Sequence, residues 1–561
     1  MSLQKKEKAW NKKILYTLCF VAISFIEIIR NCQFVEMEVP TGVIRLSEVL
    51  GGLNMQDLWY IVSNCTGLVM MVIIFSAYKL KNFCTIANGM WTALCVVVMA
   101  YLPYHNQSSG AKYHLWQVEV AVLNVWWLFI IIKHLMFRMM KEKSLKIKWT
   151  TQDILWALMT LCMVLSVNEN KVWPVWYLLM FGVFYLTEYS KEDKESLYTG
   201  MIDGSILSFC IVQMGAFFLR PYDELRYTGI HYNSNMAGLY YLTIYMMCLY
   251  KLHLLQIKKE KRGKKVFYLL LAGVTLSLQF MTMCRTAWIC SVVVTIFYGI
   301  FVMRKSWEQQ FHQILLRGVF LVFSMALTFV PVFMAARWLS TTLPIRVWYG
   351  GEWGSKTKIT MSDAADSEKY TEIDELLNEV FGRLQIGGFL SKIENPFVLK
   401  AYAQEIEETY DRVELVEPDW ITDQGFRERI SIYKAYWDDL TLVGNSSESG
   451  FYYLGEGNYH SWHAQNLWLQ IAYYYGVPAG IMLILLTLTL LVYGYRLMMK
   501  NKENPYAIIP FFMSIVFFGF GTMEVVWNLG QMILFLIFFV QKPLGNIQLV
   551  EEKSLESEKN N

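Results

Sequence analysis

Long apolar runs separated by short polar loops make up most of the chain. Runs of about 17 to 25 apolar residues can cross a membrane as helices. Lipid forces each span to satisfy its own backbone hydrogen bonds, and runs without strict alternation indicate helices rather than barrel strands. The pattern predicts an all-α polytopic transmembrane bundle of about fourteen spans. They are Ile14–Ile29, Leu58–Leu80, Cys84–Leu102, Leu115–Phe137, Ile154–Val167, Val172–Tyr189, Met201–Leu219, Met236–Tyr250, Val266–Met281, Ala287–Met303, Leu315–Ala336, Gly476–Tyr495, Ile508–Thr522 and Val526–Val540.

Lysine and arginine gather in every second loop, which indicates the orientation of the spans. Cytoplasmic loops carry the excess of these residues, so we expect both termini in the cytoplasm. The basic segments are Lys5 to Lys13, Lys79 and Lys81, Lys141 to Lys148, Lys191 and Lys194, Lys258 to Lys265, Arg304 and Lys305, and Arg496 to Lys502. The first span continues through Glu27 and Arg30 without a small-residue cleavage site, so we expect an uncleaved anchor.

One long polar segment interrupts the apolar pattern. Residues 337–462 carry many carboxylates and no cysteine, so no disulfide framework is expected there. Apolar residues at three- and four-residue spacing over Ser367–Leu384, Pro396–Val413 and Phe426–Leu442 predict amphipathic helices. The predicted domains are a transmembrane bundle over 1–336, a helical extracytoplasmic loop over 337–462, further transmembrane helices over 463–541 and a cytoplasmic tail over 542–561. No carboxylate and histidine spacing suggests a metal site.

Several arginines and histidines fall on the expected outer face, where positive charge is unusual. They are Arg220, Arg226, Arg285, Arg383, Arg427, Arg429, His231, His460 and His463. Guanidinium groups near a membrane suit bidentate binding of phosphate. Arg285 at the outer end of a span needs a polar cavity, an ion partner or lipid headgroups, and a snorkelling arginine is the simpler alternative. His463 can exchange a proton near neutrality, although a histidine at a helix entrance is more often an interfacial group.

Four separated segments together resemble the O-antigen ligase and O-antigen polymerase superfamily. They are His231–Gly238, the helix start Arg285–Ala287, the stretch Arg429–Ala435 followed by Leu442–Gly444, and Gln465–Gln470 running to Gly476 and Gly480. The resemblance covers about 231–540, and it extends to the long loop before the last spans. By spacing, Gln465 stands where the family usually carries histidine, and glutamine cannot act as a general base. Either His463 takes that role, or Gln465 orients the acceptor, or the chain has lost activity.

The resemblance implies glycosyl transfer from an undecaprenyl-diphosphate-linked oligosaccharide at the outer face of a bacterial cytoplasmic membrane. A diphosphate leaving group needs fixed cations, which assigns Arg285 and Arg429 as catalytic residues without a metal ion or other cofactor. His463 is the expected base, with Glu456 in reserve. The expected substrate-binding residues are Arg220, Asn235, Arg383, Arg427, Gln465 and Asn466.

Three other activities stay open at this point. A ligase shares the donor chemistry and transfers the finished glycan to another acceptor, whereas the large external domain slightly favours a polymerase. A glycolipid flippase would concentrate polar groups at the bilayer midplane and on both faces. A catalytically inactive member would only bind glycan or partners. The expected partners are the lipid-linked glycan, an acceptor glycan or glycolipid, membrane lipid, and a flippase and chain-length regulator of the same pathway; nothing suggests nucleic acid.

Overall fold

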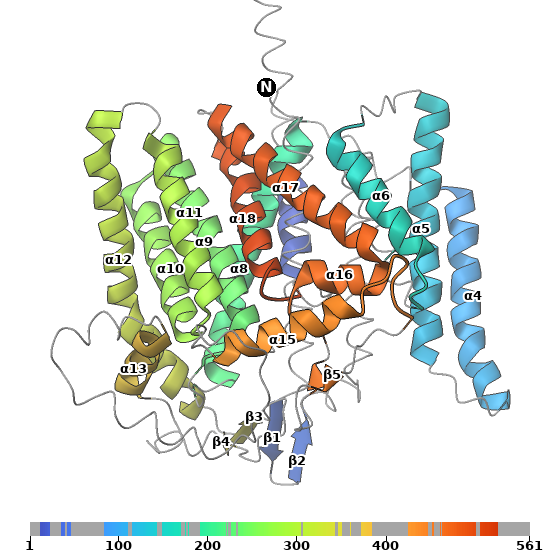
Figure 1. Cartoon of the computed structure of the whole chain (residues 1–561), viewed down its shortest axis with the longest axis horizontal. Helices are drawn as coiled ribbons and strands as arrows, with labels where there is room; N and C mark the ends of the chain where they lie inside the picture. The colour runs from blue at the N-terminus through green and yellow to red at the C-terminus, as the bar shows by residue number, and fades with distance from the viewer. Residues whose placement is uncertain are drawn as a thin grey trace, which may run out of the picture.

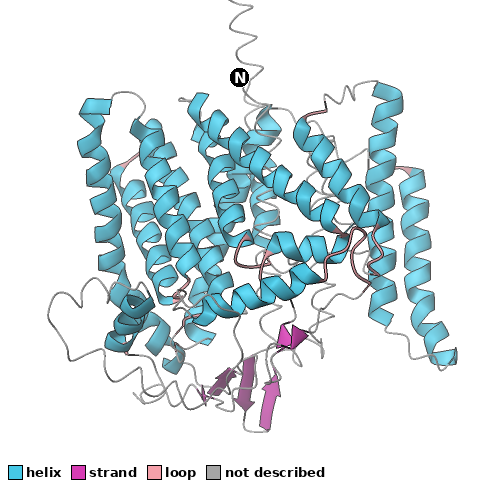
Figure 2. Cartoon of the chain, in the orientation of Figure 1, coloured by secondary structure: helices cyan, strands magenta, loops and turns pink. Residues whose placement is uncertain are grey.

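The computed structural model is a bundle of helices with small strands at one end (Figures 1 and 2). It describes residues 12–22, 35–39, 42–45, 83–109, 115–142, 149–169, 191–219, 226–229, 234–303, 307–342, 346–349, 359–360, 372–383, 424–446, 452–453, 460–461, 463–500 and 505–525, with positions 174, 178, 222 and 231. The expected spans at 58–80 and 526–540, the segment 396–413 and the tail 542–561 therefore lie outside the described residues, as does the span at 172–189 apart from positions 174 and 178.

Five of the described helices are long and apolar enough to cross a membrane, which indicates a membrane protein. Their apolar stretches are Glu192–Phe218, Arg262–Met281, Arg285–Val302, Leu315–Trp338 and Val477–Lys500. They belong to α8 (Lys191–Leu219), α10 (Arg262–Met281), α11 (Arg285–Met303), α12 (Trp307–Trp338) and α17 (Val477–Lys500). Further helices at expected spans are α4 (Ile86–Ser109), α5 (Leu115–Glu142), α6 (Thr151–Leu165), α9 (Ser234–Ile257) and α18 (Ile509–Gly521). The short 3₁₀ helices η4 (Leu339–Thr342) and η6 (Pro505–Ile508) adjoin α12 and α18.

The centre of the bundle is α9, which is buried on all sides. Most of its residues are inaccessible, from Ala237 through the run Gly238–Lys251. Such all-round burial is typical of a helix enclosed by neighbours, and α10, α11, α8 and α18 surround it. Close helix packing continues outward, since a Cβ on Gly273 of α10 would lie 2.4 Å from the Ser324 hydroxyl of α12. The four helices α9 to α12 therefore form a tightly packed unit (Figure 1).

The described fold is mainly helical, as expected, and short strands that were not predicted accompany the helices. A four-stranded antiparallel sheet has the order β2-β1-β3-β4, from β1 (Val35–Val39), β2 (Gly42–Arg45), β3 (Arg346–Tyr349) and β4 (Ile359–Thr360). A second pair joins β5 (Tyr452–Tyr453) to β6 (His460–Ser461). The long loop is thus part helix and part strand, because β3 pairs with an N-terminal strand that is about 300 residues away in sequence.

Two helices of the long loop match the predicted ones. They are α13 (Ile373–Arg383) and α15 (Gln424–Asp438). On α15 the apolar spacing brings Ile432 and Tyr436 to one face, where they pack against Ala464 and Tyr473. This packing holds α15 beside α16 (Leu467–Tyr475), with which it crosses the end of the bundle (Figure 1).

A pair of glycines fixes the segment after α15 against the junction of α16 and α17. Gly444 and Gly476 have φ angles of +84° and +95°, which favour glycine. A Cβ on Gly476 would lie 2.2 Å from the Leu442 carbonyl oxygen, and one on Gly444 would lie 2.2 Å from the Tyr474 carbonyl oxygen. The Val477 amide donates to the Thr441 carbonyl at 2.9 Å across the same contact. The glycines of the third and fourth family-like segments therefore hold α15 and α16 in a fixed relation.

Candidate functional site

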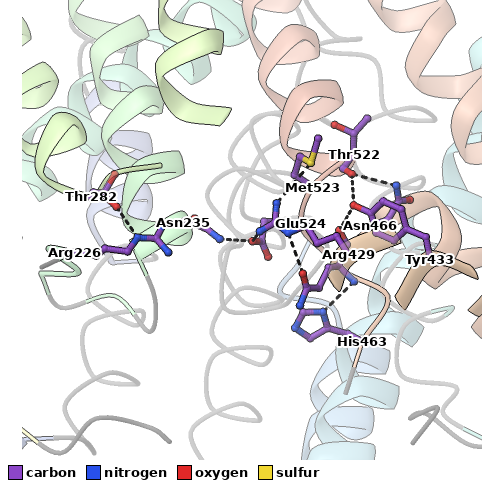
Figure 3. Close-up of polar contacts among 11 residues, drawn as sticks. Arg226, Asn235, Thr282, Arg429, Tyr433, His463, Asn466, Thr522, Met523 and Glu524 are labelled. Atoms are coloured by element: carbon purple, nitrogen blue, oxygen red, sulfur yellow. Dashed lines mark hydrogen bonds and ion pairs between the residues drawn. The ribbon is translucent and has the colours of Figure 1, made fainter. Parts of the chain in front are cut away.

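Arg429 on α15 is the first member of a polar cluster at the end of the bundle (Figure 3). Its Nε donates to Gln465 Oε1 at 3.1 Å, its Nη2 to Glu524 Oε1 at 3.5 Å and its Nη1 to Met523 Sδ at 3.6 Å. The side chain is 26% exposed. A guanidinium group has five N–H donors, so two remain for a ligand on the accessible edge.

Glu524 follows α18 in a short turn and is almost completely buried, with 8% of its side chain exposed. Its backbone amide donates to the Phe520 carbonyl at 2.8 Å, which fixes the turn. The Oε1 atom accepts from Asn235 and from Arg429. Burial raises the pKa of this carboxyl group, and Arg429, Asn235 and Arg226 oppose the rise.

Both side-chain hydrogen bonds to the Glu524 carboxylate end on Oε1, and among the described residues none reaches Oε2. A carboxylate oxygen without a donor can accept a proton. Because burial raises the pKa of Glu524, its carboxylate is more basic than that of an ordinary glutamate, which favours proton transfer to it. Glu524 is therefore the carboxylate of the cluster with the chemistry of a general base.

Asn235, the second residue of α9, connects Glu524 to a second guanidinium group. Its amide donates to Glu524, and its Oδ1 accepts from Arg226 Nη2 at 2.8 Å. Arg226 Nε also donates to the Thr282 carbonyl at 3.2 Å. The two contacts fix the amide orientation of Asn235, since its nitrogen must face the carboxylate and its oxygen the arginine. The segment before α9 and the turn before α11 thus meet the end of α18.

Gln465 lies in the left-handed region, with φ of +48°. This conformation is unusual for a residue with a side chain and is typical of functional sites and tight turns. It turns the side-chain oxygen of Gln465 toward Arg429, while its carbonyl oxygen lies 3.2 Å from the Tyr433 hydroxyl. That hydroxyl is also 3.0 Å from the Thr522 carbonyl, so Tyr433 links the Gln465 turn to the Glu524 turn.

Asn466 begins α16 and holds the same two turns together. Its Oδ1 accepts from the Leu469 amide at 3.0 Å, which is the usual role of an asparagine N-cap. Its Nδ2 donates to the Thr522 carbonyl at 3.2 Å. The asparagine thus has a structural role in placing Gln465 beside Arg429.

His463 lies at the edge of the cluster, and its ring is exposed. The Gln465 amide donates to Nδ1 at 3.2 Å. Desolvation by the surrounding protein is the main cause that lowers the pKa of the imidazole, and the positive charge of Arg429 is the second cause. With Nδ1 accepting, the neutral ring carries its proton on Nε2. In this arrangement neither nitrogen is ready to take a proton, so His463 is suited to donate a hydrogen bond.

The cluster as a whole favours an anion. It contains the guanidinium groups of Arg226 and Arg429 and one carboxylate, which leaves one net positive charge when Glu524 is ionised. The positive groups come from two sides of the buried carboxylate (Figure 3). Within the part of the chain that the structure describes, no group of three histidine, cysteine or acidic side chains is arranged to hold a metal ion.

The structure brings together five of the predicted site residues: Arg429, His463, Gln465, Asn466 and Asn235 (Figure 3). Arg285 is the first residue of α11 and is exposed, three positions beyond Thr282. Arg383 ends α13 and Arg427 lies on α15, but their side chains, like Arg220 as a whole, are outside the described part.

Two residues of the cluster had no predicted role. Arg226 was one of several external arginines, and its flanking polar loop suggested a lipid contact. Glu524 was one of the charged residues at span ends. The signal available for Glu524 was its position inside an apolar stretch, where an ionisable residue marks a functional site by default.

Comparison with known proteins does not identify the chain. No protein-family model matches the sequence, and no curated protein matches it significantly.

Proposed function

We propose that this protein is a glycosyltransferase that acts on undecaprenyl-diphosphate-linked oligosaccharides and polymerises the repeat units of a surface polysaccharide. The observation that carries the proposal is the cluster around Glu524. Residues of the first, third and fourth family-like segments, Asn235, Arg429 and Gln465, meet there although they are separated by up to about 230 positions. The second segment follows the turn whose Thr282 carbonyl holds Arg226.

Binding of the diphosphate is assigned to Arg429 and Arg226. Each guanidinium group can form paired, charge-assisted hydrogen bonds with phosphate oxygens. The contact between Arg429 and Glu524 is long, at 3.5 Å, so the arginine can exchange it for a phosphate oxygen at modest cost. Gln465 and Asn235 hold the two arginines by their other nitrogens. The site is therefore oriented before the substrate arrives, which lowers the cost of binding.

Transfer of the sugar is assigned to the same cluster. The bond between the anomeric carbon and the diphosphate oxygen breaks, and its electron pair stays on the diphosphate. The two arginines stabilise the charge that develops there. The acceptor hydroxyl forms the new bond to the anomeric carbon, and its proton passes to the Oε2 atom of Glu524. The products are the elongated glycan and the free lipid diphosphate.

Gln465 and His463 have supporting roles in this proposal. Gln465 orients Arg429 through its side-chain oxygen, a task that needs no titratable group. His463 offers its Nε2 proton to a phosphate or sugar oxygen, because its Nδ1 already accepts from the Gln465 amide. The replacement of the family histidine by glutamine is then compatible with activity, since the proton acceptor is Glu524.

The topology proposed from the sequence agrees with this position of the cluster. Positive-inside counting assigns the turn at Lys258–Lys265, between α9 and α10, to the cytoplasm. The cluster includes Asn235 at the opposite end of α9. A bundle of about fourteen spans with both termini in the cytoplasm would expose it to the outer face of a bacterial cytoplasmic membrane, beside the long loop.

The test is glycan chain length on the lipid carrier, measured by gel and mass spectrometry in a deletion strain. The strain is complemented with wild type, Arg429→Ala, Glu524→Gln or Lys434→Ala. Lys434 is the matched control, since it is an exposed cation on the same helix. The proposal expects single repeats to accumulate with the first two variants and long chains with Lys434→Ala.

Other outcomes of the same test point elsewhere. Long chains that stay on the carrier in the deletion strain would identify a ligase. Single repeats trapped on the cytoplasmic side would identify a flippase, and unchanged chain length and attachment would refute glycosyl transfer.

A further inference from the structure

A groove between α11 and α12 lies away from the Glu524 cluster. It has a volume of about 750 Å³ and is lined by residues 295–302 of α11 and 315–326 of α12. This volume is within the range of about 300–1,000 Å³ that is usual for small-molecule sites. The lining is apolar and includes Ile296, Val302, Leu315, Val319, Val322 and Phe323. Ile296, Leu315, Val319, Val322 and Phe323 are more than half exposed on the outer surface of the bundle, where lipid would contact them.

Arg317 is the charged residue in the groove lining. Its Nη1 atom is buried and has no hydrogen-bond partner, and no ion pair involves its side chain among the described residues. An arginine inside an apolar span normally pairs with an anion or marks a binding pathway, because an unpaired charge there is costly. The residue lies in the apolar stretch Leu315–Trp338, and no described side chain supplies an anion to it.

His253 on α9 adds a second unsatisfied polar group nearby. Neither ring nitrogen has a hydrogen-bond partner, and the ring packs edge-on against Phe301 and Tyr298 of α11 at 5.1 and 6.2 Å. Tyr298 also lines the groove, and the charge of Arg317 reaches the imidazole. Among the described residues, the polar end of the groove therefore has a positive charge and no anion beside it.

This polar end faces the basic end of the bundle. α9 and α11 both run toward it, and α10 and α12 both begin there. The turn between α9 and α10 contributes Lys258, Lys259, Lys261, Arg262, Lys264 and Lys265 at this end. Basic residues beside a span attract anionic lipids. An apolar groove that ends in an arginine near such a surface has the shape and charge of an amphiphile with a negative headgroup.

We propose that the groove between α11 and α12 binds one anionic phospholipid, with its phosphate on Arg317 and an acyl chain along the apolar lining. The site is separate from the transferase cluster and does not depend on that assignment. Arg317 suits the headgroup because its planar donors match phosphate oxygens. The acyl chain covers lining side chains such as Val319, Val322 and Phe323, which are more than half exposed.

Native mass spectrometry of the purified full-length protein tests the proposal, with phosphatidylglycerol as the probe and phosphatidylcholine for comparison. Arg317→Gln removes the charge, and Arg317→Lys keeps it. Gly318→Phe places a ring at the groove, where the added Cβ itself meets nothing within 4 Å. Arg496→Gln is the matched control, since Arg496 is an exposed arginine near the basic end of α17.

The proposal expects phosphatidylglycerol retention to fall about tenfold or more in Arg317→Gln, as charge-assisted hydrogen bonds predict. Gly318→Phe should lose retention similarly, while Arg317→Lys should keep part of it and Arg496→Gln should match wild type. Equal retention of phosphatidylcholine, an equal loss in Arg496→Gln, or wild-type retention in Gly318→Phe would overturn the proposal. Preferential retention of undecaprenyl phosphate over phosphatidylglycerol would reject the phospholipid assignment as well. If Arg317→Gln does not fold, Gly318→Phe and Arg317→Lys still decide the outcome.

Discussion

Replacing Glu524 by glutamine separates proton transfer from substrate binding. Glutamine has nearly the same shape, and its side-chain oxygen can still accept from Asn235 and Arg429. The substitution removes the negative charge between the two guanidinium groups and the ability to take a proton. We therefore expect Glu524→Gln to fold, to bind the lipid diphosphate, and to fail in transfer.

The size of the effect follows from the proposed role of each group. General acid-base catalysis by a placed side chain contributes about 10²–10⁴-fold, so kcat should fall by that factor. The net charge of the cluster rises from one to two when the carboxylate is lost, so the Kd for undecaprenyl diphosphate should stay the same or decrease. Arg429→Ala should do the opposite to binding and raise this Kd about tenfold or more, through the loss of charge-assisted hydrogen bonds.

The assay is glycosyl transfer with the purified protein in lipid nanodiscs, with the Kd for undecaprenyl diphosphate measured separately by calorimetry. Lys434→Ala again serves as the control for a lost cation on α15. A Glu524→Gln enzyme with wild-type kcat would refute the assignment of the base. A large increase in Kd for the same variant would show that Glu524 holds the arginines in place instead of accepting a proton.

Four other measurements follow from the structure. Because burial raises the pKa of Glu524, the carboxyl group binds its proton more tightly in the folded protein than in the unfolded chain. The free energy of unfolding should therefore fall as pH rises from 4.5 through the raised pKa. Thermal unfolding measured against pH should show this fall in wild type and not in Glu524→Gln. Transfer activity should rise with pH over the same range, and the acidic limb of the pH-rate profile should persist in Glu524→Asp. An acidic limb at or below pH 4.5 would contradict a raised pKa of Glu524. Gly476→Ala should cost about 2–5 kcal/mol, because φ of +95° disfavours a side chain and the added Cβ meets the Leu442 carbonyl; thermal unfolding measures it, and a change below about 0.5 kcal/mol would contradict the geometry. Asn466→Ala should cost about 1 kcal/mol by loss of the helix cap, whereas Asn466→Asp, which keeps the capping oxygen, should recover most of it.

The sequence predicted the helical parts of the site well because their patterns are local. The apolar spacing predicted an amphipathic helix over Phe426–Leu442, and on α15 it brings Ile432 and Tyr436 to one face. Asn235 and Gln465 were singled out because the short segments that contain them resemble motifs of a known family. These features depend on residues within a few positions of one another, which is the range over which hydrophobic periodicity and capping act.

Glu524 and Arg226 could not be assigned from the sequence for a different reason. Each is a single charged residue at the end of an apolar stretch or in a polar loop, and such residues commonly bind lipid headgroups or pair with a neighbour. Their roles depend on Asn235, which is 289 positions from Glu524 and connects them in space. No local pattern carries that information.

Arg285 stays a predicted site residue, and its side chain is exposed at the start of α11. The turn before it contributes the Thr282 carbonyl to Arg226, a contact that the motif did not indicate. The strands were not predicted because their pairing is not local. β1 alternates strictly over Val35–Val39, but its partner β3 begins only at Arg346.

The most direct test of the central claim uses purified protein and a defined undecaprenyl-diphosphate-linked oligosaccharide as both donor and acceptor. Mass spectrometry of the products would compare wild type with Arg429→Ala and Lys434→Ala. Our account predicts elongated lipid-linked glycan and free undecaprenyl diphosphate with wild type and Lys434→Ala, and neither product above background with Arg429→Ala. Substrate that stays unchanged with the folded wild-type protein, or equal elongation by Arg429→Ala, would contradict it.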